Sequence, residues 1–436
     1  MNLEGLNLEQ RRAAETLEGP VLILAGAGSG KTRALTYRIA NLIDHGVAPW
    51  HILAITFTNK AAKEMRERVS ALVGEAADDV WVSTFHSMCA RILRRDIEKL
   101  GYTRSFTIYD DDDQNSVLKE LYKQLGVDDK QMSLRETKSK LGDAKNRLLG
   151  PDEWFEQSPR DFRSQQFHDL YVAYEAKLRH GNALDFDDLL VRTLELFADH
   201  PPVLESYRDK FRYVHVDEYQ DTNFAQYSLV KLLTQKSRNL CVVGDDDQSI
   251  YGWRGADIRN ILDFEKDFPD AAVIKLEQNY RSTANILDAA NQVIAHNEGR
   301  MEKTLWTDSP AGAPIGVFCA GDEREEAAWI CDRMRQQQLA GQSYGSMAVL
   351  YRSNVQSRVL EEMLVRAGIP YRIYGGLRFY DRREVKDIVA YLRCVVNPAD
   401  DVSLRRIINQ PKRSIGDSTI AELVRHAAKK EMPLYS

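Results

Sequence analysis

The sequence predicts an α/β fold in which helices wrap a parallel sheet. Short β-rich apolar runs lie at 20–25, 51–57, 211–216 and 239–244, and each leads into a polar loop and a helix-like segment. Alternation of this kind is typical of a parallel sheet. A chain of 436 residues, 43% of them hydrophobic, is too long for one core. We therefore expect about two to four domains.

Composition excludes several classes of protein. The 28% of charged residues accompany 14 Phe, 19 Tyr and 6 Trp, enough apolar surface to exclude a mostly disordered chain. No run approaches the roughly 18 apolar residues that span a bilayer, and the N-terminus lacks the pattern of a signal peptide. The 5 cysteines form no C-x-x-C pair, which argues against a disulfide framework and a zinc site. We expect a soluble, cytoplasmic chain with reduced thiols.

Charge alone leaves nucleic-acid binding open. The net charge of -6 is the opposite of what a wholly basic DNA-binding surface shows. Local basic clusters at 60–68 and 91–95 could nevertheless form a basic track on an acidic protein. For any single cluster, the solvated face of a helix is the favoured interpretation.

A long, charged, Leu-rich stretch separates the second and third apolar runs. It covers 92–201, has helical spacing, and predicts a helical insertion within the α/β domain. Strand-like segments then return at 273–276, 315–319, 346–351 and 371–374. With an amphipathic helix over 322–338 between them, they predict a second α/β domain, after which the pattern turns helical.

A glycine-rich segment follows the first apolar run and opens a helix, the context that a phosphate-binding loop requires. Its residues are Ala25, Gly26, Ala27, Gly28, Ser29, Gly30, Lys31 and Thr32, with Arg33 next to them. Glycines let backbone N–H groups turn toward a polyphosphate, and the helix N-terminus adds its positive dipole end. Lys31 would reach the β and γ phosphates, and Thr32 would ligate Mg²⁺. The alternative is a glycine-containing turn that binds nothing.

Two adjacent carboxylates, Asp217 and Glu218, end the third apolar run. A carboxylate at a strand tip beside a phosphate loop can hold Mg²⁺, and its neighbour can orient or deprotonate the attacking water. We assign the first role to Asp217 and the second to Glu218. Without a phosphate loop nearby, the two acids would be interpreted as a helix cap.

The next apolar run leads into a loop that combines acids, an amide and aromatic rings. Gln248 lies where a side-chain amide could sense the γ-phosphate, because the strand tips of one sheet share an edge. Tyr251, Trp253 and Arg254 place two aromatics and a cation between glycines. That combination suits stacking on unpaired bases, at about 1–3 kcal/mol per base. A local core cluster is the alternative.

Taken in order, these motifs resemble the UvrD/PcrA/Rep group of superfamily 1 DNA helicases. The matching segments are 8–10, 25–32, 56–62, 83–86, 184–188, 216–223, 243–256 and 276–283. They cover essentially the whole chain, and so many linked motifs make coincidence negligible. The phosphate loop by itself would indicate only an NTPase.

The resemblance implies a domain scheme. Residues 1–86 and 212–277 would form a first RecA-like domain, a P-loop NTPase fold with a parallel sheet. Residues 87–211 would form the helical insertion domain. Residues 278–374 would be part of a second RecA-like domain, and 375–436 the start of a further helical domain.

The resemblance also implies residue roles. Gln10 would read the adenine edge, Tyr280 would stack on the base, and Arg281 would reach the γ-phosphate from the second domain. A groove for single-stranded DNA would be lined by Phe57, Asn59, Thr84, Phe85, His86, Tyr251, Trp253 and Arg254, with Arg352 and Asn354 from the second domain. Each groove residue has an alternative interpretation as a helix cap or core residue.

Two further segments have competing interpretations. The acidic run 110–113 invites a metal site, but we interpret it as a solvated turn and helix cap. Segment 410–416 resembles the family's hairpin that grips duplex phosphates, although Ser414 replaces the expected glycine.

The function implied is an ATP- and Mg²⁺-dependent 3′-to-5′ helicase and translocase. Its substrates would be single-stranded DNA and single-strand/duplex junctions, in repair or replication restart, without a membrane partner. Family members continue further and supply an arginine finger, whose loss is worth about 10³–10⁵ in rate. We therefore expect an N-terminal fragment that binds ATP and DNA but hydrolyses and unwinds poorly. The alternatives are the motor of a nuclease-coupled recombination enzyme, or a nucleotide-gated DNA-binding module without motor activity.

Overall fold

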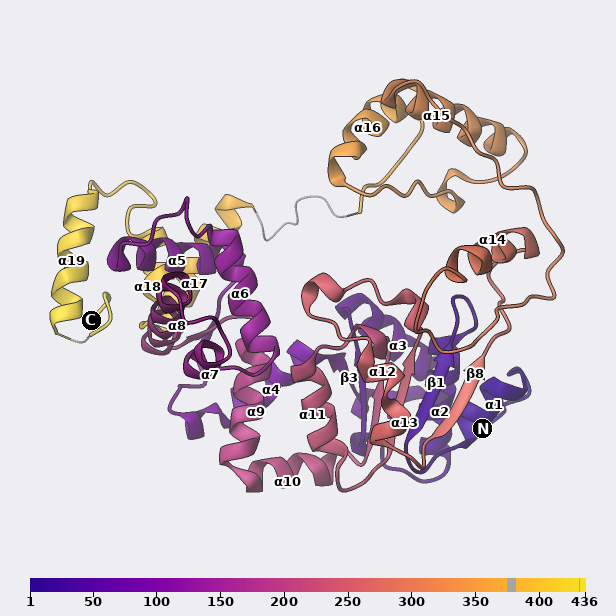
Figure 1. Ribbon diagram of the computed structural model, residues 1–436, viewed down its shortest axis with the longest axis horizontal. Helices are drawn as coiled ribbons and strands as arrows, with labels where there is room; N and C mark the ends of the chain where they lie inside the picture. The colour runs from indigo at the N-terminus through magenta and orange to yellow at the C-terminus, as the bar shows by residue number, and fades with distance from the viewer. Residues whose placement is uncertain (375–381, 431) are drawn as a thin grey trace. The chain divides into compact units, whose positions relative to one another are not determined.

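The computed structural model describes residues 1–374, 382–430 and 432–436. Contacts divide the chain into two units, one made of 1–312 with 391–436 and the other of 313–390 (Figure 1). Within the described ranges, no helix combines the length and the apolar character needed to cross a membrane.

A six-stranded parallel sheet forms the centre of the first unit, which confirms the predicted fold class. In spatial order the strands are β3 (Trp81–Thr84), β2 (Ile52–Thr56), β6 (Tyr213–Val216), β7 (Leu240–Gly244), β1 (Val21–Ala25) and β8 (Ala272–Leu276). Every neighbouring pair runs parallel. Strands β1, β2 and β7 are buried along their whole length, so the sequence shows continuous apolar runs instead of alternation.

Strand β8 settles the place of segment 273–276. The hydrophobic pattern of the sequence groups segment 273–276 with the later strand-like segments, whereas the family resemblance places it in the first RecA-like domain. In the structure β8 pairs with β1, with Val21 opposite Ala272, and forms the edge of the first sheet. Apolar periodicity identifies a strand but does not say which sheet edge will pair with it.

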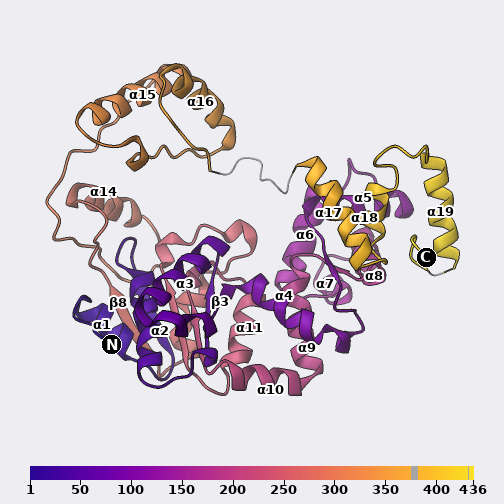
Figure 2. The same cartoon turned by 180° about the vertical axis from the view of Figure 1, so that it is seen from behind.

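Helices cover both faces of this sheet (Figures 1 and 2). Side chains alternate along a strand, so Val21 and Ile23 of β1 face one core while Leu22 and Leu24 face the other. The first core is closed by α1 (Leu8–Glu15), α2 (Lys31–Asp44) and α3 (Asn59–Val73). The second is closed by α4 (Phe85–Asp96), α9 (Asp188–Asp199), α10 (Pro201–Lys210), α11 (Phe224–Thr234), α12 (Arg259–Leu262) and α13 (Phe264–Asp267).

The predicted helical insertion is present between β3 and β6. It contains α5 (Asp111–Leu125), α6 (Leu134–Asn146), α7 (Pro151–Glu156), α8 (Phe162–His180) and a two-stranded sheet of β4 (Thr107–Ile108) and β5 (Ala183–Leu184). Phe167 and Tyr174 lie in a separate core of this region. The acidic run 110–113 begins α5, where Asp110 and Asp113 form a capping box, which confirms the helix-cap interpretation.

The remaining helices have these bounds: α14 (Ala284–Ile294), α15 (Glu323–Leu339), α16 (Ser357–Arg366), α17 (Arg383–Val396), α18 (Asp401–Ile407) and α19 (Asp417–Lys429). The short 3₁₀ helices are η1 (Pro49–His51), η2 (Gly74–Asp79), η3 (Ile97–Leu100), η4 (Tyr219–Asp221), η5 (Asp246–Gln248), η6 (Gly252–Arg254), η7 (Tyr344–Ser346) and η8 (Asn354–Gln356).

Residues 391–436 pack on the helical insertion through ion pairs. Arg393 lies 2.7 Å from Asp113, and Arg405 lies 2.8 Å from Glu120. These contacts explain why 391–436 is grouped with the first unit.

Ser414 lies in the segment that resembles a duplex-gripping hairpin. Its φ of 60° is in the left-handed region, which a side chain makes unfavourable by about 1–2 kcal/mol. The backbone therefore has the conformation that suits the expected glycine, and contact with duplex phosphates stays a prediction.

The second unit contains the predicted helix of 322–338 as α15, packed against α16 through Cys331, Leu364 and Ile369. Within 313–374 the structure has no strand, so the strands expected at 315–319, 346–351 and 371–374 were wrong. These segments lack ladder partners there, and a strand is defined by pairing as well as by composition.

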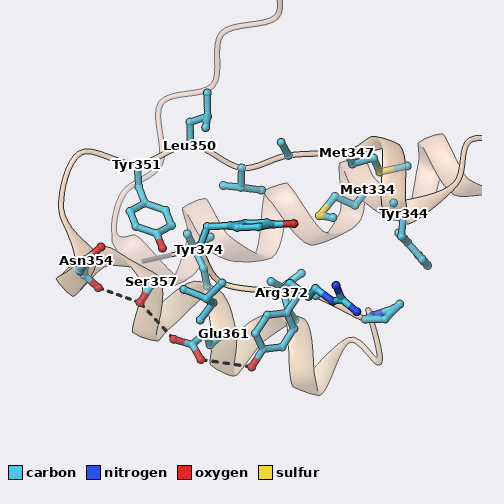
Figure 3. Close-up of a pocket in the computed structure, with 18 residues that line it drawn as sticks. Met334, Tyr344, Met347, Leu350, Tyr351, Asn354, Ser357, Glu361, Arg372 and Tyr374 are labelled. Carbon is cyan, nitrogen blue, oxygen red and sulfur yellow. Dashed lines mark hydrogen bonds between the residues drawn. The ribbon is translucent and has the colours of Figure 1, made fainter. Parts of the chain in front are cut away.

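The extended segments of this unit line a cavity instead. It has a volume of about 690 Å³ and lies between α15, α16 and the segments 347–351 and 370–374 (Figure 3). Ser357 donates to the Asn354 carbonyl at 2.9 Å, and Tyr371 donates to Glu361 at 3.4 Å. Apolar side chains such as Leu350 stay exposed at its rim.

Candidate nucleotide pocket and DNA groove

The predicted phosphate loop connects β1 to α2, and each of its glycines has a structural reason. Gly30 caps α2 with a φ of 85°, and Gly28 has a φ of 69°, both in the left-handed region. A Cβ on Gly28 would lie 2.7 Å from the Asn279 amide nitrogen. A Cβ on Gly26 would lie 2.0 Å from the Leu305 side chain. Close packing of later segments therefore requires glycine at 26 and 28, in addition to any phosphate.

The segment that follows β8 is hydrogen-bonded to this loop. The Asn279 amide donates to the Ala27 carbonyl at 2.6 Å, and the Tyr280 N–H donates to the Gly28 carbonyl at 3.0 Å. Arg281 has its backbone N–H bonded to Asn279 at 2.9 Å. The structure thus brings Tyr280 and Arg281 next to the phosphate loop within one unit.

Lys31 and the two predicted catalytic carboxylates meet at the carboxyl edge of the sheet. Lys31 Nζ lies 3.0 Å from Glu218 Oε2. Glu218 has left-handed backbone angles with a φ of 53°, a strained conformation for a residue other than glycine. Lys31 lowers the pKa of Glu218 despite burial, so that carboxylate is charged at neutral pH.

Asp217 is buried beside this pair. Burial, with the charge of Glu218, raises the pKa of Asp217 to about 6. One of its oxygens accepts the Glu218 N–H at 3.0 Å. Asp217 lies close enough to Lys31, the first residue of α2, for the Lys31 charge to act on its pKa, and Thr32 is the next residue of that helix. A carboxylate and a hydroxyl are the hard oxygen ligands that Mg²⁺ prefers. The residue types of Thr32 and Asp217 suit Mg²⁺, and the site itself stays a prediction.

The two residues assigned to the nucleotide base are linked through Asn7. Asn7 donates to the Tyr280 hydroxyl at 2.8 Å, and it forms the capping box of α1 with Gln10. Gln10 is buried, and its amide nitrogen donates to the Ser29 carbonyl at 2.8 Å. Reading an adenine edge would require Gln10 to exchange this bond for one to the base. Tyr280 keeps an exposed ring, as stacking requires.

Two other predicted pocket residues are engaged by protein groups. Arg33 donates to the Gly5 carbonyl at 2.8 Å. The Gln248 amide donates to the Asp245 carboxylate at 2.5 Å, and contact with a γ-phosphate stays a prediction.

Three consecutive acids, Asp245, Asp246 and Asp247, come close enough together to share a cation. The ammonium group of the buried Lys303 takes the place of a metal cation here. It lies 3.0 Å from Asp245 and 2.7 Å from Asp247, and it also contacts Asp246. Arg300 adds a second contact to Asp247, at 2.7 Å. This cluster is therefore an ion-pair network between 245–247 and the segment that follows α14.

A groove of about 550 Å³ lies between the sheet edge and the insertion. Its lining includes Thr56, Phe57, Phe85, His86, Lys138, Ser139, Gly142, Asp143, Asn146, Phe186, Asp187, Asp221, Asn223, Gln226, Gly252, Trp253, Arg254 and Gly255. Phe57 stacks on Tyr251 with ring centroids 4.9 Å apart, so these two predicted residues meet. Trp253 is 75% exposed, and Arg254 lies 4.5 Å from the centre of its ring.

Other predicted groove residues have mixed roles. Thr84 caps α4, and its hydroxyl also lies 3.5 Å from Asn59, so the cap interpretation holds for Thr84. Phe85 is buried in the core but still reaches the groove. Burial lowers the pKa of His86 to about 4, so its ring is neutral and can serve for stacking.

Arg352 and Asn354 belong to the second unit. Arg352 is exposed, and Asn354 begins η8 and lines the cavity of Figure 3. Their contribution to a DNA groove stays a prediction.

Several contacting residues were missed by sequence reasoning. Phe186, whose ring lies 4.9 Å from that of His86, was quoted only as part of a resemblance. Lys303 and Leu305 lie in no recognised motif, and only the structure brings them to the acids and the loop. Gln220 lies inside the matching segment 216–223, which was the signal that the sequence offered, and its burial appears only in the structure.

Two family models match the chain. The model described as the UvrD/REP helicase N-terminal domain matches residues 6–269, and that of the UvrD-like helicase C-terminal domain matches residues 274–435. Neither match supports the expectation that ATP would be hydrolysed poorly.

The names of two curated relatives agree with these family models. The chain is 53% identical over 434 residues to an "ATP-dependent DNA helicase PcrA" of Staphylococcus epidermidis and 52% identical to one of Staphylococcus aureus. Each alignment covers 99% of this chain and 59% of the relative, so the chain spans about three-fifths of the length of these relatives.

Proposed function

The chain belongs to the UvrD/REP helicase family, and from that premise we propose that it is an ATP-dependent DNA helicase moving 3′ to 5′ along single-stranded DNA. One observation carries the proposal. Lys31 and the Asp217–Glu218 pair meet at the same sheet edge from which the aromatic loop with Tyr251 emerges. A structural change that follows ATP binding or hydrolysis at this edge can therefore be passed to the aromatic side chains that would contact DNA bases.

The proposed hydrolysis begins from the ion pair between Lys31 and Glu218. A triphosphate attracts Lys31 to its β and γ phosphates, because their charge exceeds that of one carboxylate. Glu218 then becomes free to accept a proton from the attacking water. Thr32 and Asp217 would hold Mg²⁺, which supplies neutralisation of the phosphate charge. The exposed Arg281 would reach the γ-phosphate.

Base recognition follows from the neighbours of the phosphate loop. The exposed ring of Tyr280 would stack on adenine, and Asn7 and Gln278 hold its hydroxyl in place. Gln10 would read the adenine edge once it releases Ser29.

Single-stranded DNA would occupy the groove beside Trp253. Phe57, Tyr251, Trp253 and His86 supply aromatic faces, to which we add Phe186, and stacking on them needs no particular sequence. Arg254 and, from the second unit, Arg352 would contact phosphates or bases. We propose that the protein acts in DNA repair or replication restart. We expect it in the cytoplasm or nucleoid, where DNA is found.

The test is ATP turnover with and without a dT oligonucleotide. A motor couples the two sites, so turnover should rise severalfold with DNA. A nucleotide-gated binding module would bind DNA with no rise in turnover, and that result would contradict the proposal. A nuclease-coupled motor would show the same stimulation and differ by cutting DNA.

A further inference from the structure

Gln220 is a buried amide between the catalytic carboxylate and the aromatic loop. It lies in η4, two residues after Glu218, and its side chain is only 1% exposed. Its Nε2 donates to Glu218 Oε2 at 2.9 Å, and its Oε1 accepts the backbone N–H of Asp245 at 3.0 Å. Both ends of the amide are therefore engaged, each by a different functional segment.

Strand β7 ends in a glycine that leaves room for the Gln220 side chain. Gly244 is the last residue of β7, and a Cβ there would lie 2.7 Å from Gln220 Oε1 and 3.3 Å from its backbone nitrogen. Any larger residue would push the amide away from Asp245. A second bond, from the Ser249 hydroxyl to the Gln220 carbonyl at 3.2 Å, joins the same loop to η4.

Beyond Asp245 the connection reaches the stacking ring. The Asp245 carboxylate accepts from the Gln248 amide and from Lys303, at 3.0 Å, which fixes the start of the loop. Three residues after Gln248, Tyr251 stacks on Phe57. Asp245 and Tyr251 therefore lie in the same loop, and Tyr251 contacts Phe57, which lines the groove.

At the other end, one oxygen atom serves two donors. Glu218 Oε2 accepts from Lys31 at 3.0 Å and from Gln220 at 2.9 Å. When a triphosphate withdraws Lys31, the bond from Gln220 becomes the remaining constraint on this oxygen. Since an amide donates only at nitrogen and accepts only at oxygen, one orientation of the Gln220 side chain satisfies both Glu218 and Asp245, and a displacement of Glu218 would strain the bond to Asp245.

We infer that Gln220 is a positioning residue that transmits the nucleotide state from Glu218 to the base-stacking loop. The inference rests on the proposed function. It predicts that loss of Gln220 uncouples the two sites while each still binds its ligand.

The experiment compares Gln220→Met with the unchanged chain. Methionine has a similar volume and keeps the core filled, but it makes neither hydrogen bond. We expect ATPγS affinity to change by less than about threefold, because Lys31 and the phosphate loop are left intact. Stimulation by a dT oligonucleotide, taken as the ratio of turnover with DNA to turnover without it, should fall from severalfold to nearly onefold. The effect of ATPγS on the affinity for that oligonucleotide should disappear.

Asn41→Leu provides the matched control. Asn41 is also a buried amide of the first unit, and its side-chain nitrogen donates to the Ala14 carbonyl at 3.0 Å. We expect it to lower thermal stability and leave DNA stimulation unchanged. If Gln220→Met behaves like Asn41→Leu, Gln220 only fills and stabilises the core, and the inference is overturned.

Gln220→Glu covers the case in which Gln220→Met does not fold. It keeps an acceptor for Asp245 but cannot donate to Glu218, so stimulation should again be lost; full stimulation would overturn the inference. A failure of the proposed function is distinguishable, because the unchanged chain would then show no stimulation at all.

Discussion

At the scale of single residues, the ion pair between Lys31 and Glu218 separates binding from chemistry. Lys31→Ala should abolish productive ATP binding, because it removes the cation that meets the phosphates. Glu218→Gln should preserve binding but lower turnover by about 10²–10⁴, the usual contribution of a general base. ATPγS binding and steady-state turnover measure the two effects. Equal loss of binding in both variants would contradict the roles assigned to them.

Trp253 is the residue whose exposure most directly indicates a ligand. Trp253→Ala should weaken the affinity for a dT oligonucleotide by about 1–3 kcal/mol, the usual value of one base stacked on an aromatic ring. The dependence of affinity on salt should be almost unchanged, because stacking releases no counterions. Titrations at several salt concentrations measure both quantities. A large change in the salt dependence of the affinity would contradict the assignment of Trp253 to base stacking in the groove.

His215 links stability to pH. It is buried in β6, and burial together with the charge of Arg38 lowers its pKa to about 3, against about 6.5 in an unfolded chain. Between these values the unfolded chain binds the additional proton, so the stability conferred by a neutral His215 is complete above pH 6.5 and is lost as pH falls. His215→Leu should therefore lose less thermal stability between pH 7 and pH 5 than the unchanged chain. An equal loss in both would contradict this account.

At the scale of elements, Lys303 fastens the segment after α14 to the loop after β7. Lys303→Met would remove the buried cation that contacts three carboxylates. Breaking a buried ion pair in this way typically lowers the free energy of unfolding by about 3–5 kcal/mol. Denaturant unfolding measures this cost. Lys266→Met is the control, because Lys266 pairs with Asp263 on the surface, where an ion pair contributes about 0–1 kcal/mol. Similar losses in the two variants would show that the network is not needed for stability.

The elements also show how far the sequence could predict the fold. Strands β1, β2 and β7 were predictable because each is buried along its whole length and ends in a polar motif. Strand β3 was not predicted, and β8 was grouped with the later strand-like segments. Segments 315–319, 346–351 and 371–374 have similar composition, but pairing depends on partners that composition does not describe. Likewise, the phosphate loop was predictable from its glycines, whereas the contact between Gly26 and Leu305 depends on a chain segment almost 280 residues away.

At the scale of the whole molecule, the pocket and the groove belong to one unit, so the residues between them lie within that unit as well. Sequence motifs predicted both sites, because each carries residue types that its chemistry requires. They did not predict the connection, because Gln220 and Lys303 act through burial and pairing. Arg352 and Asn354, in the second unit, extend the groove only as a proposal.

The central claim is that ATP hydrolysis drives movement toward the 5′ end of single-stranded DNA. The most direct measurement follows the fluorescence of dT oligonucleotides of increasing length, labelled at one end, after ATP is added to bound protein. The account predicts that the time to signal grows with length when the label is at the 5′ end, and that no such lag occurs with a 3′ label. Turnover that DNA stimulates, with a signal independent of length at both ends, would contradict it.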